Sequence, residues 1–356
     1  MKQDKKLSFA GQHIYCGLDV HKKSWSVCIR DENMELKTFS QSPDPKLLVE
    51  YLHRNYPDAN YHAVYEAGFS GYWTQRQLSE QGVDCIITHP ADVPTSDKQR
   101  RRKTDEVDCR KLAKSLSEQS IEGIDIPSEQ LVDDRNIVRT RNKLVTDQTR
   151  YKNRIMSWLN FKGIKVPEGY KKTSHFSKRF ISWLEALQLE ENAKTSLQIK
   201  LETLKVIRQQ LLTITKHLRK LSQTQRYTQQ VDLLQSVPGI GVINAMVLLT
   251  EIGNIGRFKT LDHLCGYAGL VPDIYSSGET KIIKGITNAC NHLIREALVE
   301  SAWMALRKDP ALLMVYKKCL QRMHHNKAII KIAKKLLNRI RYVLRNQKKY
   351  VLCVVG

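Results

Sequence analysis

The stretch HIYCGLDVHKKSWSVCIRDENMELKTFS, residues 13–40, decides how the first part of the chain folds. It contains three short segments rich in β-branched, aromatic and other apolar residues, separated by polar residues, and this pattern predicts three antiparallel strands. The apolar pattern then predicts a helix around 46–56, a strand at 61–66, a helix near 71–81, a strand at 83–89 and a helix at 104–117. The order β-β-β-α-β-α-β-α predicts a mixed sheet flanked by helices.

The rest of the chain is predicted to be mainly helical. Residues 131–225 show no convincing strand and contain one proline, Pro167. A leucine-rich stripe recurs there every three or four residues, as in a coiled coil, although a helix packed on its own domain has the same pattern. We therefore expect an α/β domain at 1–125, an all-α coiled-coil region at 126–228 and a mainly α C-terminal domain at 229–356. The stripe consists of Leu197, Leu201, Leu204, Ile207, Leu211, Ile214, Leu218 and Leu221.

The charge of the chain favours a polyanionic partner. Its 58 Lys and Arg exceed its 36 Asp and Glu, which gives a formal net charge of +22. Neutralising phosphates and releasing their counterions would make nucleic acid the leading partner. A basic solvated surface or a membrane-surface protein is the alternative on charge alone. No carboxylate follows Asp309, whereas lysines and arginines accumulate there, so an anion is expected alongside those helices.

Targeting and cysteine patterns restrict the class of protein. The first residues, MKQDKKLSFAGQ, lack the apolar run of a secretory signal, and no stretch reaches about 18 uncharged apolar residues. We therefore expect a cytoplasmic protein with no membrane contact. The eight cysteines form no CxxC pair, which argues against a zinc ribbon or a disulfide framework.

Four carboxylates could hold a divalent metal. Asp19 lies within the first predicted strand among apolar residues, where a carboxylate is costly unless it is paired or bound to metal. Glu66 ends the predicted strand at 61–66, beside the first strand. Asp105 and Asp108 are three residues apart and so share one helix face. Each acid alone is readily explained as a turn residue, a surface charge or a favourable charge at a helix N-terminus. Together they would converge in a ribonuclease-H-like fold and suit two-metal phosphodiester chemistry.

Three further motifs suggest contacts to nucleic acid or chemistry on it. A basic run precedes the helix at 104–117 and would neutralise phosphates, unless it is simply a solvated loop. In SVPGIG, residues 236–241, Gly239 and Gly241 resemble the turn of a helix-hairpin-helix, where backbone N–H groups approach a phosphate, but a plain helix-helix turn uses similar residues. Ser277 before Gly278 would ordinarily be turn chemistry. The basic run consists of Lys98, Arg100, Arg101, Arg102 and Lys103.

The motifs in combination resemble the DEDD transposases of bacterial insertion sequences, a family that includes the Piv-type DNA invertases and RNA-guided bridge recombinases. The N-terminal half of the match rests on GLDVHKKSW, YEAG and KTDEVD, which align the family's four acids with Asp19, Glu66, Asp105 and Asp108. The C-terminal half rests on SVPGIG, GYAGLVP, SSG and GITNACNHLIREALVESAW. One departure is Cys290, which stands where the family usually has glycine.

The resemblance implies a RuvC-like catalytic domain, a coiled coil and a C-terminal transposase domain that completes a composite active site. It implies Mg²⁺ bound by the four acids, with Mn²⁺ as the alternative, and a serine that links covalently to DNA. The matching serine is Ser277, with Ser276 next to it. The resemblance further implies DNA ends and target as substrates, a structured guide RNA in some relatives, and a homo-oligomer, dimer or tetramer. A RuvC-like junction nuclease that uses water, a DNA invertase and a non-catalytic nucleic-acid-binding protein remain alternatives.

Overall fold

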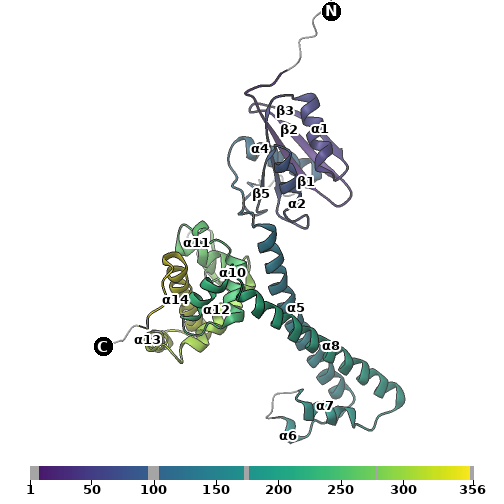
Figure 1. The fold of residues 1–356 in the computed structure, drawn as a ribbon, viewed down its shortest axis with the longest axis vertical. Helices are drawn as coiled ribbons and strands as arrows, with labels where there is room; N and C mark the ends of the chain where they lie inside the picture. Colours follow the sequence, from purple (N-terminus) through teal and green to yellow (C-terminus); the bar gives the residue numbers. More distant parts are fainter. Residues whose placement is uncertain (1–7, 95–103, 172–175, 278–279, 353–356) are drawn as a thin grey trace, which may run out of the picture. The chain divides into compact units, whose positions relative to one another are not determined.

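The computed structural model describes residues 8–94, 104–171, 176–277 and 280–352. The chain forms two compact units, Met1–Ile126 and Pro127–Gly356, each of which is described by itself (Figure 1). The regions expected at 126–228 and 229–356 both fall in the second unit, and their separation into two domains stays a prediction. Within the described ranges, no helix is long and apolar enough to cross a membrane.

The first unit contains a mixed five-stranded sheet. Its strand order is β3-β2-β1-β4-β5. The three N-terminal strands pair antiparallel, while β4 runs parallel to both β1 and β5. The expected α/β sheet is thus confirmed. The strands are β1 (His13–Val20), β2 (Trp25–Arg30), β3 (Glu35–Gln41), β4 (Asn60–Glu66) and β5 (Asp84–Thr88).

Helices cover both faces of this sheet. On one face, Cys16 and Leu18 of β1 belong to a buried cluster with α1 (Pro45–Asn55) and α2 (Trp73–Glu80). On the other face, Val64 of β4 packs with Leu112 of α4 (Asp105–Ser117). Since successive side chains of a strand alternate between faces, the residues of β1 on the α4 side are those at odd positions, among them Gly17 and Asp19.

The missing side chain of Gly17 allows α4 to lie against β1. A Cβ atom at this position would be 2.1 Å from the carbonyl oxygen of Cys109 and 2.3 Å from the backbone nitrogen of Ala113, both in α4. Because these are backbone atoms of a helix, no side-chain rotation could relieve the overlap. Gly17 therefore sets how closely the helix that begins with Asp105 approaches the strand that carries Asp19.

The second unit is mainly helical, with one two-stranded antiparallel sheet, β6 (Pro272–Ser277) and β7 (Thr280–Ile286). Ser277, for which ordinary turn chemistry was expected, is the last residue of strand β6. The sequence of the hairpin, IYSS and TKIIKGI, is rich in the β-branched and aromatic residues that favour strands. The helices of this unit are α5 (Glu129–Phe161), α6 (Glu168–Lys171), α7 (Lys178–Glu185), α8 (Glu191–Ser222), α9 (Thr228–Gln235), α10 (Val242–Ile252), the 3₁₀ helix η1 (Ile255–Arg257), α11 (Leu261–Tyr267), α12 (His292–Ala305), α13 (Pro310–Leu320) and α14 (His325–Asn346).

The leucine stripe of α8 packs within the chain. The two long helices α5 and α8 lie side by side (Figure 1). Leu197, Leu201 and Leu204 are buried in a cluster that includes residues of α5 and α7, and Leu218 and Leu221 belong to the core of the C-terminal helices. Intramolecular packing thus accounts for both ends of the stripe, and an intermolecular coiled coil stays a prediction.

We expect Gly17→Ala to destabilise the first unit by about 3 kcal/mol, at the upper end of the usual cost of overpacking, because the added methyl would overlap backbone atoms of α4. Urea unfolding followed by circular dichroism measures this change. Gly266→Ala is the matched control, since a Cβ at Gly266 would have no heavy atom within 4 Å. Equal stability of the Gly17 variant and the control would contradict this account of the contact between β1 and α4.

Candidate active site

Asp19, His21 and Asp105 form a cluster in the first unit. Asp19 Oδ2 lies 3.2 Å from His21 Nε2, and the same nitrogen lies 3.6 Å from Asp105 Oδ2. One ligand atom from each of the three residues lies within 4.8 Å of the others. Two residues that the sequence placed in the site, Asp19 and Asp105, are therefore brought together by the packing of α4 on β1.

Glu66 and Asp108 lie on the elements that carry this cluster, although neither belongs to that group of three. Leu18 of β1 pairs with Tyr65 of β4, so Asp19 and Glu66 are the next residues of two adjacent parallel strands. Neighbouring residues in register point to the same face of a sheet. Asp108 lies one turn after Asp105, half-buried, with its Oδ1 3.5 Å from Lys111 Nζ. Glu66 thus leaves the sheet on the same face as Asp19, and Asp108 is close enough for its charge to raise the pKa of Asp19.

The start of α4 is determined locally by Thr104. Its side-chain hydroxyl accepts a hydrogen bond from the backbone N–H of Val107, as expected of an N-cap residue. The first turn then carries Asp105, Glu106 and Asp108. Negative side chains are favourable at a helix N-terminus, so local physics alone accounts for acids here. What it does not account for is the placement of this turn beside a half-buried Asp19.

Burial raises the pKa of Asp19 above its usual value, which is the largest effect on this carboxyl group. The nearby imidazole of His21 lowers this pKa, whereas the negative charges of Asp105 and Asp108 raise it. Desolvation and like-charge repulsion both disfavour the ionised carboxylate. A divalent cation placed among these oxygens would offset both effects.

The donor atoms of the cluster fit a hard divalent cation. Carboxylate oxygens are the ligands that Mg²⁺ and Mn²⁺ prefer, and an imidazole nitrogen is better suited to Mn²⁺ than to Mg²⁺. Sequence reasoning did not include His21 in the site. His21 follows Asp19 by two residues, but it lies just after Val20, the last residue of β1, in a polar turn where a histidine is ordinary.

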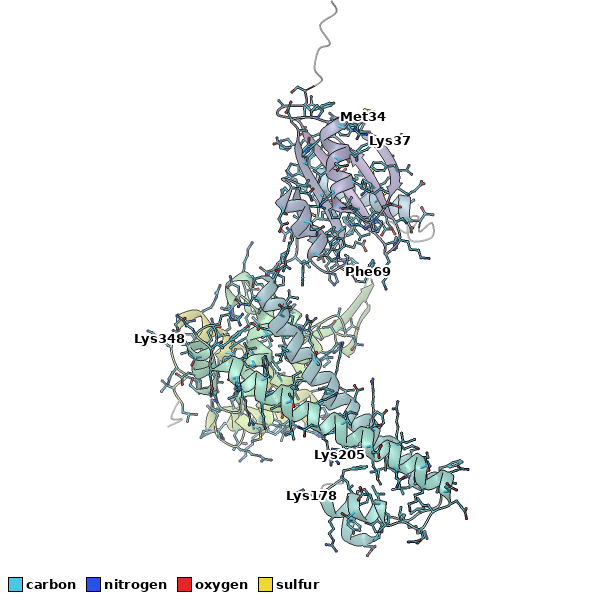
Figure 2. The ribbon with its side chains drawn as sticks, turned by 45° about the vertical axis from the view of Figure 1, so that its right-hand side comes forward. Met34, Lys37, Phe69, Lys178, Lys205 and Lys348 are labelled. Atoms are coloured by element: carbon cyan, nitrogen blue, oxygen red, sulfur yellow. The ribbon has the colours of Figure 1, made fainter. Side chains whose placement is uncertain are left out.

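The loop after β4 places an aromatic residue near these groups. Phe69 follows Glu66 by three residues, and its side chain is 61% exposed. Lys22, next to His21, holds its Nζ 6.0 Å from the centre of the Phe69 ring. Figure 2 shows Phe69 at the surface of the first unit. An apolar ring and a cation therefore lie close together on two loops, one of which begins with His21 of the cluster.

The structure describes some, but not all, of the residues that the sequence predicts to contact nucleic acid. The basic run Lys98–Lys103 lies outside the described residues. Gly239 has a φ of +88°, and a Cβ there would be 2.2 Å from the carbonyl oxygen of Ser301 in α12, so helix packing by itself requires this glycine. Gly241 is the N-cap of α10 and has open space around it, with no side-chain cap hydrogen bond. A phosphate contact at either glycine stays a prediction.

Ser276 and Ser277 are the last residues of β6, in the second unit. Ser276 pairs with Lys281 and Ser277 pairs with Thr280 in the hairpin. Cys290, at the position where glycine was expected, lies against Gly269: a Cβ on Gly269 would be 2.4 Å from Cys290 Sγ. The larger residue at 290 is thus accommodated because residue 269 has no side chain.

Two family models match the chain. A DEDD-type IS110 transposase model matches residues 16–163, and the model described as "Transposase IS116/IS110/IS902 family" matches residues 231–317. The first match spans β1, β4 and α4, and with them all four acids. The chain belongs to the IS110-type family of transposases. The second match spans the hairpin that carries Ser276 and Ser277.

Individual relatives agree with this assignment. The protein y4qE of Sinorhizobium fredii is 29% identical over 67% of this chain and 57% of its own length. The transposase for insertion sequence element IS1533 of Leptospira borgpetersenii is 26% identical over 82% of this chain and 84% of its own length. The transposase for IS1111A of Coxiella burnetii is 24% identical over 80% of this chain and 77% of its own length.

We expect Asp19→Asn to raise the thermal unfolding temperature at neutral pH in the absence of metal. The raised pKa of Asp19 means that its ionised form, present above that pKa, costs folding free energy, and this cost disappears as the pH falls through the pKa. The amide removes the charge and so removes the cost. Scanning fluorimetry in chelator measures the change.

Binding of metal should reverse the order of thermal stability of the unsubstituted protein and Asp19→Asn. At a Mn²⁺ concentration 100 times the dissociation constant, the unsubstituted protein should gain about 2.7 kcal/mol of stability, and Asp19→Asn should gain little. Glu50→Gln, on α1 across the sheet, is the control and should behave like the unsubstituted protein. An equal metal-induced shift in the Asp19 variant would show that the ion binds elsewhere.

Proposed function

We propose that this protein cuts and rejoins DNA as the transposase of an insertion sequence. The observation that carries the proposal is the convergence of Asp19 and Asp105, from a strand and a helix far apart in sequence, on one group of ligand atoms. The names of the IS1533 and IS1111A relatives, both transposases for insertion sequence elements, support the same function. The substrates are the ends of the element and a target DNA.

We assign the first unit a ribonuclease-H-like, RuvC-like fold. The support is the order β3-β2-β1-β4-β5, with three antiparallel strands followed by parallel β4 and β5, and the helix α4 across β1. In this arrangement Asp19, Glu66, Asp105 and Asp108 hold Mg²⁺, or Mn²⁺, at the C-terminal ends of β1 and β4. A bound pair of such ions would activate a nucleophile and stabilise the leaving oxygen of a phosphodiester.

Ser277 is the proposed nucleophile, with its neighbour Ser276 as the alternative. In the proposed step, Ser277 Oγ gives its proton to a base and forms a bond to phosphorus. The bond from phosphorus to one DNA oxygen breaks, and that oxygen takes up a proton and leaves as a DNA hydroxyl. The phosphoserine ester keeps the energy of the broken bond, so a second DNA hydroxyl can reverse the reaction and join a new strand without an external energy source. The support is the match of the second family model across residues 231–317.

The partners follow from charge and from the long helices. A net charge of +22 favours DNA, and it would equally favour a structured guide RNA encoded by the element. The exposed side chains Ile199, Val206 and Leu212 on α8 would suit contact with a second chain in a dimer or tetramer. Gly241 at the N-terminus of α10 and the basic run at 98–103 are the proposed contacts to phosphates of the bound nucleic acid.

The test is to mix purified protein, Mg²⁺, DNA carrying the ends of its element and RNA transcribed from the element's flanks, then to look for a protein–DNA adduct that survives denaturation. We expect an adduct that is lost in Ser277→Ala and in Asp19→Ala. Removing a nucleophile or a metal ligand should lower the rate by about 10³-fold or more. Ser276→Ala distinguishes the two serines and should keep the adduct if Ser277 is the nucleophile. Glu50→Gln is the matched control and should keep the adduct in either case.

Two outcomes would overturn parts of this proposal. Cleavage without an adduct, unchanged in Ser277→Ala, would make the protein a RuvC-like nuclease that uses water. Tight DNA binding without any metal-dependent cleavage would make it a non-catalytic binding protein. Whether the product is an insertion or an inversion is read from the sequence of the joined DNA.

A further inference from the structure

A groove of about 1170 Å³ opens in the second unit, and none of its lining residues belongs to the hairpin that carries Ser277. One wall is the last part of α14, a second is the segment 253–256 after α10, and a third is the segment 347–351 that follows α14. Gln347 has a φ of +52°, which ends the helix and turns the chain back along it. The N–H of Tyr350 then donates to Ser236 Oγ at 2.8 Å, so this third wall is tied to the end of α9.

Helix α14 presents two different faces. Ile332, Leu336 and Ile340 are fully buried in the core of the unit. Asn338, Arg341, Tyr342 and Arg345 are spaced by three, four and seven residues, so they share another face, and all four line the groove. The helix therefore holds a cationic and aromatic surface on a rigid, well-packed element.

Part of the groove's positive charge is neutralised by carboxylates. Arg339 forms an ion pair with the buried Asp309 and stacks over the ring of Tyr350 at 5.1 Å. Lys349 Nζ lies 2.8 Å from Asp232 Oδ2. These pairs hold the walls in place and leave little charge for a ligand.

Three other cations of the groove have no carboxylate partner among the described residues. Arg341 donates from Nη2 to the carbonyl oxygen of Lys259 at 3.0 Å, while its Nε is buried and has no hydrogen-bond partner in the described part of the chain. Arg345 and Lys348 are exposed, and Figure 2 shows Lys348 at the surface of the unit. No Asp or Glu is among the described lining residues. Such a groove attracts a polyanion.

The groove also contains groups that suit nucleobases. The side chain of Tyr342 is 58% exposed, and it lies one residue from Arg341 and three from Arg345. The amides of Asn338, Asn346 and Gln347 line the same space. An exposed aromatic ring beside a row of cations is the combination by which proteins bind single strands, since unpaired bases can stack on the ring.

We propose that this groove binds a single-stranded polynucleotide, with Arg341, Arg345 and Lys348 on successive phosphates and one base stacked on Tyr342. A duplex offers the same phosphates but keeps its bases stacked on each other, so it cannot use Tyr342. The groove shares no residue with the acidic cluster or the serine hairpin, and the proposal goes beyond the proposed function. It assigns a binding site for a strand that is not being cut.

The first experiment measures binding of short fluorescent oligo-dT, oligo-U and a duplex DNA of equal length to the full chain in chelator, where no metal-dependent cleavage can occur. Tyr342→Ala should weaken single-strand binding about tenfold, and Tyr342→Phe should leave it unchanged because the ring is kept. Duplex binding should be equal in all three proteins. A preference for oligo-dT or for oligo-U would identify the bound strand as DNA or as RNA.

The second experiment locates the contact. Iodouracil-substituted oligomers of either sugar, irradiated on the full chain, should cross-link to the peptide that contains Tyr342. Combining Arg345→Gln with Lys348→Gln should reduce the dependence of log Kd on log salt by about 1.4, which corresponds to two phosphates. Lys178→Gln with Lys205→Gln, on α7 and α8, removes two charges away from the groove and should leave the cross-link yield intact.

Three results would overturn the proposal: unchanged single-strand binding in Tyr342→Ala, equal weakening of single-strand and duplex binding in that variant, or equal loss of the cross-link in both double variants. None of these readouts depends on metal or on Ser277. A protein that fails to form a covalent DNA adduct could therefore still pass this test, and a protein that forms the adduct could still fail it.

Discussion

The close approach of α4 to β1 at Gly17 is the contact on which the candidate site depends. Asp19 is fixed by the sheet, and Asp105 and Asp108 are fixed by the N-cap of α4, but only the distance between the strand and the helix makes them one site. That distance is set by backbone atoms of Cys109 and Ala113 directly over a residue without a side chain. Glycine is required here because a side chain would overlap the helix backbone. The consequence is that the carboxylates of Asp19 and Asp105 lie close together.

The site collects negative charge within a strongly positive chain. Asp19 is half-buried near two other acids. Burial and like-charge repulsion both disfavour its ionised form and raise its pKa. Elsewhere, lysines and arginines accumulate, and those on the groove face of α14 are only partly neutralised. A divalent cation bound among the acids would relieve their repulsion, and a polynucleotide bound along α14 would neutralise the remaining cations of the groove.

The sheet and α4 could be predicted from the sequence because their apolar patterns are strong and their boundaries carry turn or cap residues, as at Thr104. The pairing of Asp19 with Asp105 could also be anticipated, since both elements were placed correctly. The hairpin β6–β7 was missed because a short strand beside Gly278 resembles a loop. His21 was missed because a histidine in a polar turn is common. Only the fold shows that this turn lies close to Asp105. The close packing at Gly239 and Gly269 depends on neighbours such as Ser301 and Cys290 that no local pattern reveals.

A crystal structure of the protein grown with Mn²⁺, with anomalous scattering to locate the ion, tests most directly whether Asp19 and Asp105 hold one metal. We expect an anomalous peak bound by carboxylate oxygens of Asp19 and Asp105, with Glu66 or Asp108 completing the ligands. A well-ordered first unit with these acids in place and no manganese between them, or with manganese bound only elsewhere, would contradict this expectation.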